Sequence, residues 1–125
     1  MKILVVDDEK DIKALFEQRF RKEIKQKQID FAFAFSGEEA LEFMSKHKHE
    51  TVLILSDINM PGMSGLELLE TIKKSYTKPP PVVMMITAYG DSENYEKANR
   101  LGADDFLTKP IDFKALKERL NIRIA

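Results

Sequence analysis

The sequence predicts a doubly wound α/β fold with a five-stranded parallel sheet. Three segments, residues 2–6, 52–56 and 82–86, are almost continuous runs of Val, Ile, Leu and Met, which is typical of parallel strands buried on both faces. Segments with apolar residues at helical spacing lie between the strands. A repeated β-α order predicts right-handed crossovers and helices on both faces of the sheet.

The first crossover segment carries apolar residues at helical spacing, at Ile12, Leu15, Phe16, Phe20 and Ile24. This spacing predicts one amphipathic helix from about Lys10 to Lys25, with charges on the opposite face. A basic run at its end, Lys22, Lys25 and Lys27, is interleaved with Glu23 and predicts a solvated face.

A second strand follows at residues 31–35, where Phe alternates with Ala, and the small side chains on one face allow a helix to approach closely. Two serines are each followed three residues later by a glutamate, Ser36 by Glu39 and Ser64 by Glu67. This capping-box spacing predicts that a helix begins after each serine.

The carboxyl-terminal third continues the same alternation. A fourth helix is predicted from about Glu93 to Leu101, because Gly102 is typical of the position just beyond a helix end. The fifth strand contains residues 106–107. Asp112 is a suitable cap for a last helix over residues 113–120.

Length and composition narrow the class of protein. A chain of 125 residues with 43% hydrophobic and 33% charged residues predicts a single soluble domain over residues 1–125, with no output domain in this chain. The apolar runs are too short for a membrane span, and the first one lacks a secretory cleavage site, so we expect a cytoplasmic protein. A net charge of -1 does not favour nucleic acid, and the absence of cysteine excludes thiolate metal sites.

Polar residues follow the predicted strands where each one ends. Asp7 and Asp8 follow the first strand, Asp57 the third, Thr87 the fourth and Lys109 the fifth. Because the carboxyl ends of parallel strands meet at one crevice, these side chains should converge there. The sequence therefore predicts a functional site at this edge of the sheet.

The carboxylates suit a divalent cation. Magnesium prefers oxygen ligands and keeps several waters, so Asp8 and Asp57 with a backbone carbonyl would be sufficient, and Asp7 would be an outer partner. Carboxylates packed together repel each other, so we expect raised carboxyl pKa values without metal. A carboxylate can also accept a phosphoryl group, provided that Lys109 and the metal neutralise its charge while the Thr87 hydroxyl donates a hydrogen bond.

The strand-end residues belong to a larger set of motifs: Asp7-Asp8, Asp57-Ile58-Asn59-Met60-Pro61-Gly62, Gly65, Thr87-Ala88 and Lys109-Pro110. Over essentially the whole chain this set resembles the receiver domain of two-component response regulators, which have a flavodoxin-like (βα)5 fold. The resemblance implies a signalling switch that catalyses only its own phosphorylation and dephosphorylation.

The resemblance also implies roles for individual residues. Asp57 would be the phosphoacceptor. Asp7, Asp8, Asp57 and the backbone carbonyl of Asn59 would hold Mg²⁺ or Mn²⁺. Thr87 and Lys109 would bind the phosphoryl group. A cis peptide bond between Lys109 and Pro110 is implied as well.

Further implied roles concern switching and the lifetime of the phosphoryl group. In this family Thr87 would couple to the aromatic residue at position 106, which is Phe106 here and more commonly tyrosine. Its movement would change the face formed by the fourth helix, fifth strand and fifth helix. Asn59 and Tyr89 resemble the pair that tunes access of water to the phosphoryl group, and a bulky Tyr89 predicts slow autodephosphorylation.

The implied partners are a histidine kinase or histidine phosphotransfer protein as donor, and a downstream effector protein or an output domain as target. We expect a monomer or a weak phosphorylation-dependent dimer. Nothing in the sequence resembles a helix-turn-helix or a base-stacking set, so no direct nucleic-acid binding and no membrane binding are expected.

Two other functions fit the same fold. One is a receiver-like module that binds partners without phosphorylation. The other is a small Mg²⁺-dependent phosphohydrolase that uses an aspartyl phosphate. Enzymes of the haloacid-dehalogenase type place an acid two residues after the nucleophile, whereas this chain has Asn59 there.

Overall fold

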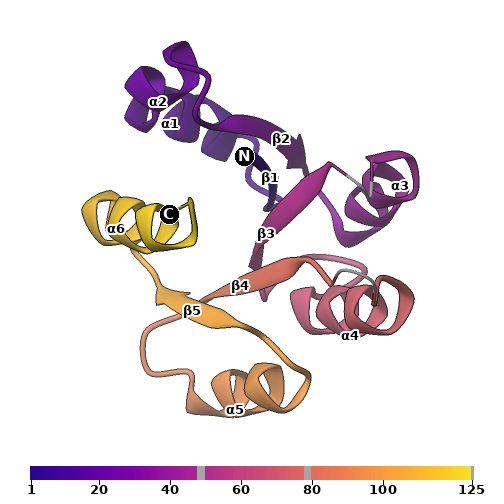
Figure 1. Cartoon of the computed structure of the whole chain (residues 1–125). Coiled ribbons are helices and arrows are strands. Elements are labelled where there is room, and N and C mark those ends of the chain that lie inside the picture. Colours follow the sequence, from indigo (N-terminus) through magenta and orange to yellow (C-terminus); the bar gives the residue numbers. More distant parts are fainter. Residues whose placement is uncertain (48–49, 78–79, 125) are drawn as a thin grey trace.

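The computed structural model of the chain describes residues 1–47, 50–77 and 80–124. Five strands and six helices form in this part of the chain (Figure 1). In chain order they are β1 (Lys2–Val6), α1 (Asp11–Arg19), α2 (Arg21–Lys25), β2 (Asp30–Ala34), α3 (Gly37–His47), β3 (Thr51–Asp57), α4 (Gly65–Ser75), β4 (Val82–Thr87), α5 (Ser92–Arg100), β5 (Asp105–Thr108) and α6 (Phe113–Ile124).

The strands form one parallel sheet in the order β2-β1-β3-β4-β5. This is the flavodoxin-like order, in which the chain reverses direction across the sheet between β1 and β3. The predicted doubly wound five-stranded fold is therefore confirmed. The reversal point matters for function, because the crevice outside the strand ends opens there.

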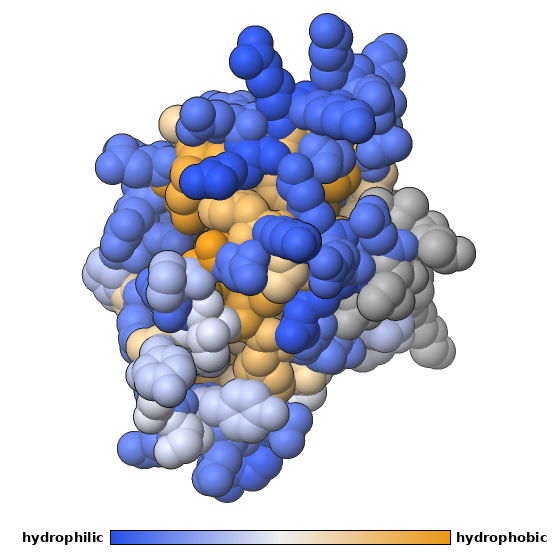
Figure 2. All heavy atoms as spheres, turned by 90° about the vertical axis from the view of Figure 1, so that its left-hand side faces the viewer, coloured by the Kyte–Doolittle hydropathy of each residue, from blue (hydrophilic) through white to orange (hydrophobic). Residues whose placement is uncertain are grey.

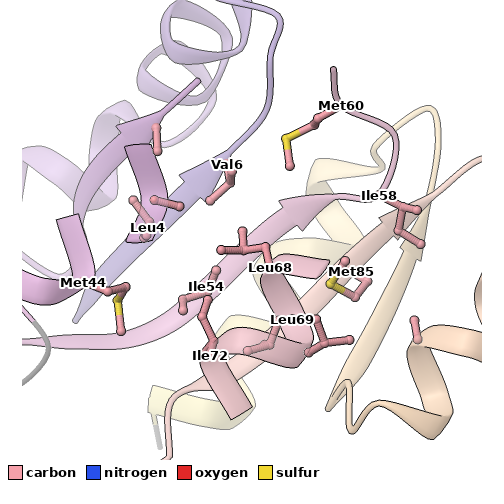
Figure 3. Close-up of a cluster of buried hydrophobic side chains, with 14 residues drawn as sticks. Leu4, Val6, Met44, Ile54, Ile58, Met60, Leu68, Leu69, Ile72 and Met85 are labelled. Carbon is pink, nitrogen blue, oxygen red and sulfur yellow. The ribbon is translucent and has the colours of Figure 1, made fainter. Parts of the chain in front are cut away.

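The sheet separates two hydrophobic cores, because successive strand residues point to opposite faces. Helices α3, α4 and α5 cover one face, whereas α1, α2 and α6 cover the other (Figure 1). In β1, Leu4 and Val6 belong to the first core, in which α4 contributes Leu69 among others (Figure 3). The intervening Ile3 and Val5 pack with Phe16, Phe20, Leu116 and Leu120 in the second core.

The first crossover differs from the prediction, because the expected single helix from Lys10 to Lys25 is two helices. At Phe20 the backbone leaves helical geometry, with φ -107° and ψ 21°. The Phe20 ring is fully buried and lies 5.1 Å from Phe31 and 6.1 Å from Phe113, measured between ring centroids. Fixing this ring in the aromatic cluster accounts for the break, which apolar spacing along the sequence does not reveal.

The predicted helix starts are present. Ser64 and Glu67 form a complete capping box, and the Ser36 hydroxyl accepts a hydrogen bond from the Glu39 backbone N–H at 3.0 Å. Asp112 caps α6 by accepting hydrogen bonds from two backbone N–H groups, and this helix extends beyond the predicted residue 120. In the described residues, no helix has the length and apolar character needed to cross a bilayer.

Candidate functional site

The polar residues that the core does contain are gathered at one edge of the sheet. In the described part of the chain, the buried polar residues are Asp7, Ser56, Asp57 and Thr87. Asp57 ends β3, Thr87 ends β4 and Asp7 follows β1. Burying a polar group costs free energy unless the group has partners. A cluster of buried polar residues at one edge of the sheet therefore marks a candidate functional site.

Three carboxylates converge there. Asp7, Asp8 and Asp57 each offer an oxygen within 4.8 Å of the others, and Asp8 is exposed to solvent. The backbone N–H of Glu9 donates a hydrogen bond to Asp7 Oδ1 at 2.9 Å, which holds the turn after β1. A set of hard oxygen donors around one point, open on one side, fits Mg²⁺ or Mn²⁺.

Asp57 is held by a cation and by its own loop. Its Oδ2 atom lies 2.8 Å from Lys109 Nζ, and its Oδ1 atom is 3.4 Å from the backbone nitrogen of Asn59. Lys109 donates its backbone N–H to the carbonyl of Thr87 at 2.9 Å, and the Lys109–Pro110 peptide bond is cis. Residues that are far apart in sequence thus form one polar cluster.

The electrostatics of the cluster are those of a site with excess negative charge. Burial is the main reason that the pKa of Asp7 lies above its usual value of 3.8, and the charge of Asp57 adds to this shift. Burial alone would lower the pKa of Lys109, but the hydrogen bond and charge of Asp57 outweigh it and raise this pKa. Without metal, Lys109 is therefore the cation that compensates Asp57.

Thr87 is directed toward the neighbouring strand. It is 3% exposed, and its hydroxyl donates a hydrogen bond to the Leu107 carbonyl of β5 at 3.4 Å. Phe106 is half-buried against the core that α5 covers, and its ring centroid lies 4.3 Å from that of Tyr95 on α5. Tyr89 follows β4 and is 89% exposed.

Two residues beside Asp57 were given no role in the predicted site: Ser56 was not singled out, and Gly65 was named only as part of the family motif. The Ser56 hydroxyl is buried and lies 3.0 Å from the Asp57 carbonyl oxygen, to which it donates a hydrogen bond. Gly65 begins α4, and a β-carbon on it would lie 2.0 Å from the same oxygen. The available signals were a hydroxyl residue at the end of an apolar run and a glycine directly after a helix cap.

A groove leads away from the site along the surface that carries α1 and α6. It has a volume of about 840 Å³, and Asp7 and Lys109 line one end while Ile12, Leu15 and Arg19 of α1 line one side. Leu15 is one of the few large apolar side chains exposed to solvent. On this side of the molecule, apolar surface is visible between hydrophilic side chains (Figure 2).

The fold and the polar edge together are those of the receiver class of signalling domains. The family model described as response regulator receiver domain matches residues 3–121, and the chain belongs to this family. The resemblance seen in the sequence is thereby confirmed.

Comparisons with individual relatives support the same family. Over 117 residues the chain is 38% identical to the response regulator protein PilR of Pseudomonas aeruginosa. The aligned region covers 94% of this chain and 24% of PilR. The chain thus spans about a quarter of that relative. A receiver domain from Clostridium thermocellum superposes with a TM-score of 0.84 at 29% identity, covering 98% of this chain and 93% of that one. For the Francisella response regulator 1452 receiver domain the TM-score is 0.80 at 32% identity, with 98% and 95% covered.

Proposed function

We propose that this receiver domain is a phosphorylation-dependent switch that accepts a phosphoryl group on Asp57 from a phosphohistidine donor, which is a histidine kinase or a histidine phosphotransfer protein. The observation that carries the proposal is the placement of Asp57. Its carboxylate is almost fully buried, lies 2.8 Å from the Lys109 ammonium and is within 4.8 Å of two other carboxylates. A nucleophile held next to compensating positive charge is what transfer of a phosphoryl group requires.

The donor set also supports a metal role. Asp7, Asp8, Asp57 and the backbone carbonyl of Asn59 would hold Mg²⁺ or Mn²⁺, and the ion when bound neutralises charge on the phosphoryl oxygens. The raised pKa of Asp7 is consistent with a cluster that is short of positive charge. Lys109 supplies part of this charge from the other side of Asp57.

In the transfer step, a carboxylate oxygen of Asp57 attacks the phosphorus of the donor. The new O–P bond forms while the N–P bond breaks, and the electron pair of the broken bond remains on the imidazole nitrogen. Lys109 remains close enough to bind a phosphoryl oxygen. The reverse of activation is attack by water, which releases phosphate and restores the Asp57 carboxylate.

We further propose that Thr87 transmits the event. Its hydrogen bond to the Leu107 carbonyl is long, at 3.4 Å, so little energy opposes its exchange for a phosphoryl oxygen. Movement of Thr87 toward Asp57 leaves space into which the Phe106 ring can rotate. Because Phe106 contacts Tyr95, the face formed by α5, β5 and α6 changes with it.

The proposed downstream target of this change is an effector protein or an output domain. In this proposal the domain is a monomer or a weak dimer that depends on phosphorylation. In this proposal residues 1–125 form one receiver domain, of which residues 48–49, 78–79 and 125 lie outside the described part. Both proposed reactions, transfer from the donor to Asp57 and hydrolysis of the adduct, take place on the domain itself, so its only catalysis would be its own phosphorylation and dephosphorylation.

Intact mass spectrometry tests the proposal directly. The protein, its Asp57→Ala variant and a control variant, Asp30→Ala, are incubated with a small phosphodonor with and without Mg²⁺. Asp30 is an exposed carboxylate paired with Lys2 at the other end of the sheet. One added phosphoryl group is expected for wild type and control, only with Mg²⁺, and none for Asp57→Ala.

Other outcomes support other functions. If the folded wild type takes up no phosphoryl group, a receiver-like module that acts by binding alone becomes the better interpretation. If donor is consumed with release of phosphate and no adduct accumulates, a phosphohydrolase or a very rapid autophosphatase replaces the proposed switch.

A further inference from the structure

The loop that follows Asp57, residues 58–64, is packed closely against the starts of two helices. A β-carbon at Gly65, the first residue of α4, would lie 2.0 Å from the Asp57 carbonyl oxygen. A β-carbon at Gly37, the first residue of α3, would lie 2.8 Å from the Met63 sulfur and 3.0 Å from its Cβ atom. The Met63 side chain therefore fills the space beside Gly37 and joins the loop to α3.

Met63 is also the methionine of this region that solvent reaches. It is partly exposed, whereas Met60 in the same loop is 8% exposed and belongs to the buried cluster (Figure 3). The chain has six methionines, all in the described part, and the other partly exposed one is Met1 at the opposite end of the sheet. The remaining three are fully buried: Met44, Met84 and Met85. A soluble oxidant should therefore reach Met63 before the other methionines near the site.

Oxidation would make the Met63 side chain unsuitable for its present position. The thioether packs against the apolar core that α3, α4 and α5 cover, and conversion to the sulfoxide adds a polar oxygen to the sulfur. On the side of Gly37 the sulfur is already in close contact, so this side offers no room for the oxygen. Burial of a polar group without a partner costs free energy. The oxidised side chain should therefore move away from Gly37.

The loop that Met63 supports completes the polar site. The backbone nitrogen of Asn59 lies 3.4 Å from Asp57 Oδ1, and the backbone carbonyl of Asn59 is a proposed metal ligand. On the other side the loop is held by the Gly65 N–H, which donates a hydrogen bond to the Ile58 carbonyl at 2.8 Å. Loss of the contact with α3 removes one support of the loop, so the Asn59 carbonyl becomes less well positioned for a metal ion.

We propose that Met63 is a site of reversible oxidation by hydrogen peroxide, and that its sulfoxide weakens Mg²⁺ binding at the Asp57 site. A lone pair of the sulfur attacks one peroxide oxygen, so that an S–O bond forms and the O–O bond breaks. The proton of the transferred oxygen moves to the departing hydroxide, which leaves as water. Sulfur loses two electrons and peroxide gains them. The inference rests on the proposed function, because it adds regulation to the same site.

Peptide mass mapping after graded exposure to hydrogen peroxide tests the modification itself. One added oxygen is expected at Met63, and at Met1, before any appears at the buried methionines. A methionine sulfoxide reductase should remove the oxygen from Met63. Oxidation of Met60 at the same rate as Met63 would overturn the assignment.

Titration calorimetry with Mg²⁺ tests the consequence in wild type, Met63→Leu and Met60→Leu, each before and after oxidation. Leucine is a well-tolerated replacement for methionine. For oxidised wild type and Met60→Leu we expect binding about three- to tenfold weaker, below the roughly 10- to 100-fold loss typical when a direct partner of a metal ligand is removed. Met63→Leu should keep its affinity after treatment, although Met1 is oxidised in it. Unchanged or tighter binding by oxidised wild type, or an equal loss in Met63→Leu, would overturn the inference.

Gly37→Ala tests the displacement of Met63 without an oxidant. The added β-carbon would occupy the place of the Met63 side chain, while alanine suits the first turn of α3. Thermal unfolding verifies that the variant is folded. Its Mg²⁺ affinity should match that of the oxidised wild type, and the affinity of unoxidised wild type would refute displacement as the cause.

Phosphorylation of the unoxidised protein by a small phosphodonor separates this inference from the proposed function. If Mg²⁺ binding depends on the oxidation of Met63 but Asp57 takes up no phosphoryl group, the proposed function alone is refuted. If Asp57 is phosphorylated and oxidation of Met63 leaves Mg²⁺ affinity unchanged, the regulatory role of Met63 alone is refuted.

Discussion

Gly65 and Asp57 are in such close contact that the glycine is part of the support of the site. A β-carbon at Gly65 would lie 2.0 Å from the Asp57 carbonyl oxygen, and the Gly65 N–H donates a hydrogen bond to the Ile58 carbonyl at 2.8 Å. The start of α4 thus packs directly on the backbone that carries the acceptor. Any side chain at position 65 must displace either the start of α4 or the backbone of Asp57.

Gly65→Ala should therefore damage both stability and function. We expect a loss of about 1–3 kcal/mol in the free energy of unfolding, as for overpacked sites, and slower phosphorylation of Asp57. Urea unfolding and the rate of adduct formation measure the two effects. Gly90→Ala is the control, because Gly90 has φ +83° but no atom near its β-carbon position. It should lose about 1 kcal/mol with unchanged phosphorylation, and equal phosphorylation by Gly65→Ala would contradict the argument.

Asp7→Asn should stabilise the metal-free protein at neutral pH. The raised pKa of Asp7 means that the folded state binds its proton more tightly than the unfolded state does. Its stabilising contribution is complete below the unfolded pKa of about 3.8 and is lost as pH rises through the raised folded value. Thermal unfolding in chelator from acid to neutral pH, compared between wild type and variant, should show the difference in this window. If wild type and Asp7→Asn lose the same stability between acid and neutral pH, burial of the charged Asp7 carboxylate does not destabilise the folded protein.

Lys109→Gln should bind Mg²⁺ more tightly than the wild type. Removing the ammonium at 2.8 Å from Asp57 leaves the carboxylates without a competing cation. We expect about fivefold tighter binding, since a screened charge pair is worth on the order of 1 kcal/mol. Titration calorimetry with Mg²⁺ gives the affinity. Lys114→Gln, which lines the same groove, is the control, and weaker binding by Lys109→Gln would rule out the competition.

Thr87→Val should separate phosphorylation from its structural consequence. Valine keeps the shape but removes the hydroxyl that donates to the Leu107 carbonyl, with a loss of about 1 kcal/mol in stability. The variant should still accept a phosphoryl group, whereas the NMR signals of the Phe106 and Tyr95 rings should no longer shift on phosphorylation. Thr87→Ser restores the hydroxyl and should restore the shifts. A full response in Thr87→Val would exclude the hydroxyl as the coupling element.

Tyr89→Ala should shorten the lifetime of the phosphoryl group. The Tyr89 ring is 89% exposed in the loop after β4, so removing it costs little stability and opens the approach of water to Asp57. We expect a decay of the adduct a few-fold faster, on the order of 1 kcal/mol in the barrier. The measurement is loss of phosphoryl mass with time after removal of donor. A faster decay in wild type than in Tyr89→Ala would refute a protective role.

The sequence was sufficient to predict the sheet because the strands of this sheet are buried on both faces. Such strands leave long apolar runs, and the polar residues that end them mark the site edge. Asp7, Asp57 and Lys109 were therefore predicted to meet although about fifty residues separate each from the next. The alternation of strands and helices predicted parallel strands with right-handed crossovers, whereas the flavodoxin-like fold was implied by the family resemblance.

What the sequence did not reveal depends on contacts between distant residues. The break at Phe20 arises where its ring is fixed against Phe31 and Phe113, while the apolar spacing continues unchanged through the break. The direction of the Thr87 hydroxyl, toward Leu107, is set by the packing of β4 on β5. Neither feature has a local sequence signal.

The division of the core by the sheet has a consequence for the order of signalling events. Leu15 and Arg19, which line the groove beside Asp57, belong to the layer of α1 and α6, whereas Phe106 packs in the layer of α5 on the other side. A reader that also covers α6 would share the first layer with a donor that approaches through the groove, whereas a reader that contacts only α5 and β5 need not exclude such a donor. The donor would then not have to dissociate before the reader binds. A ternary complex of donor, receiver domain and reader would transmit the signal without a free phosphorylated intermediate.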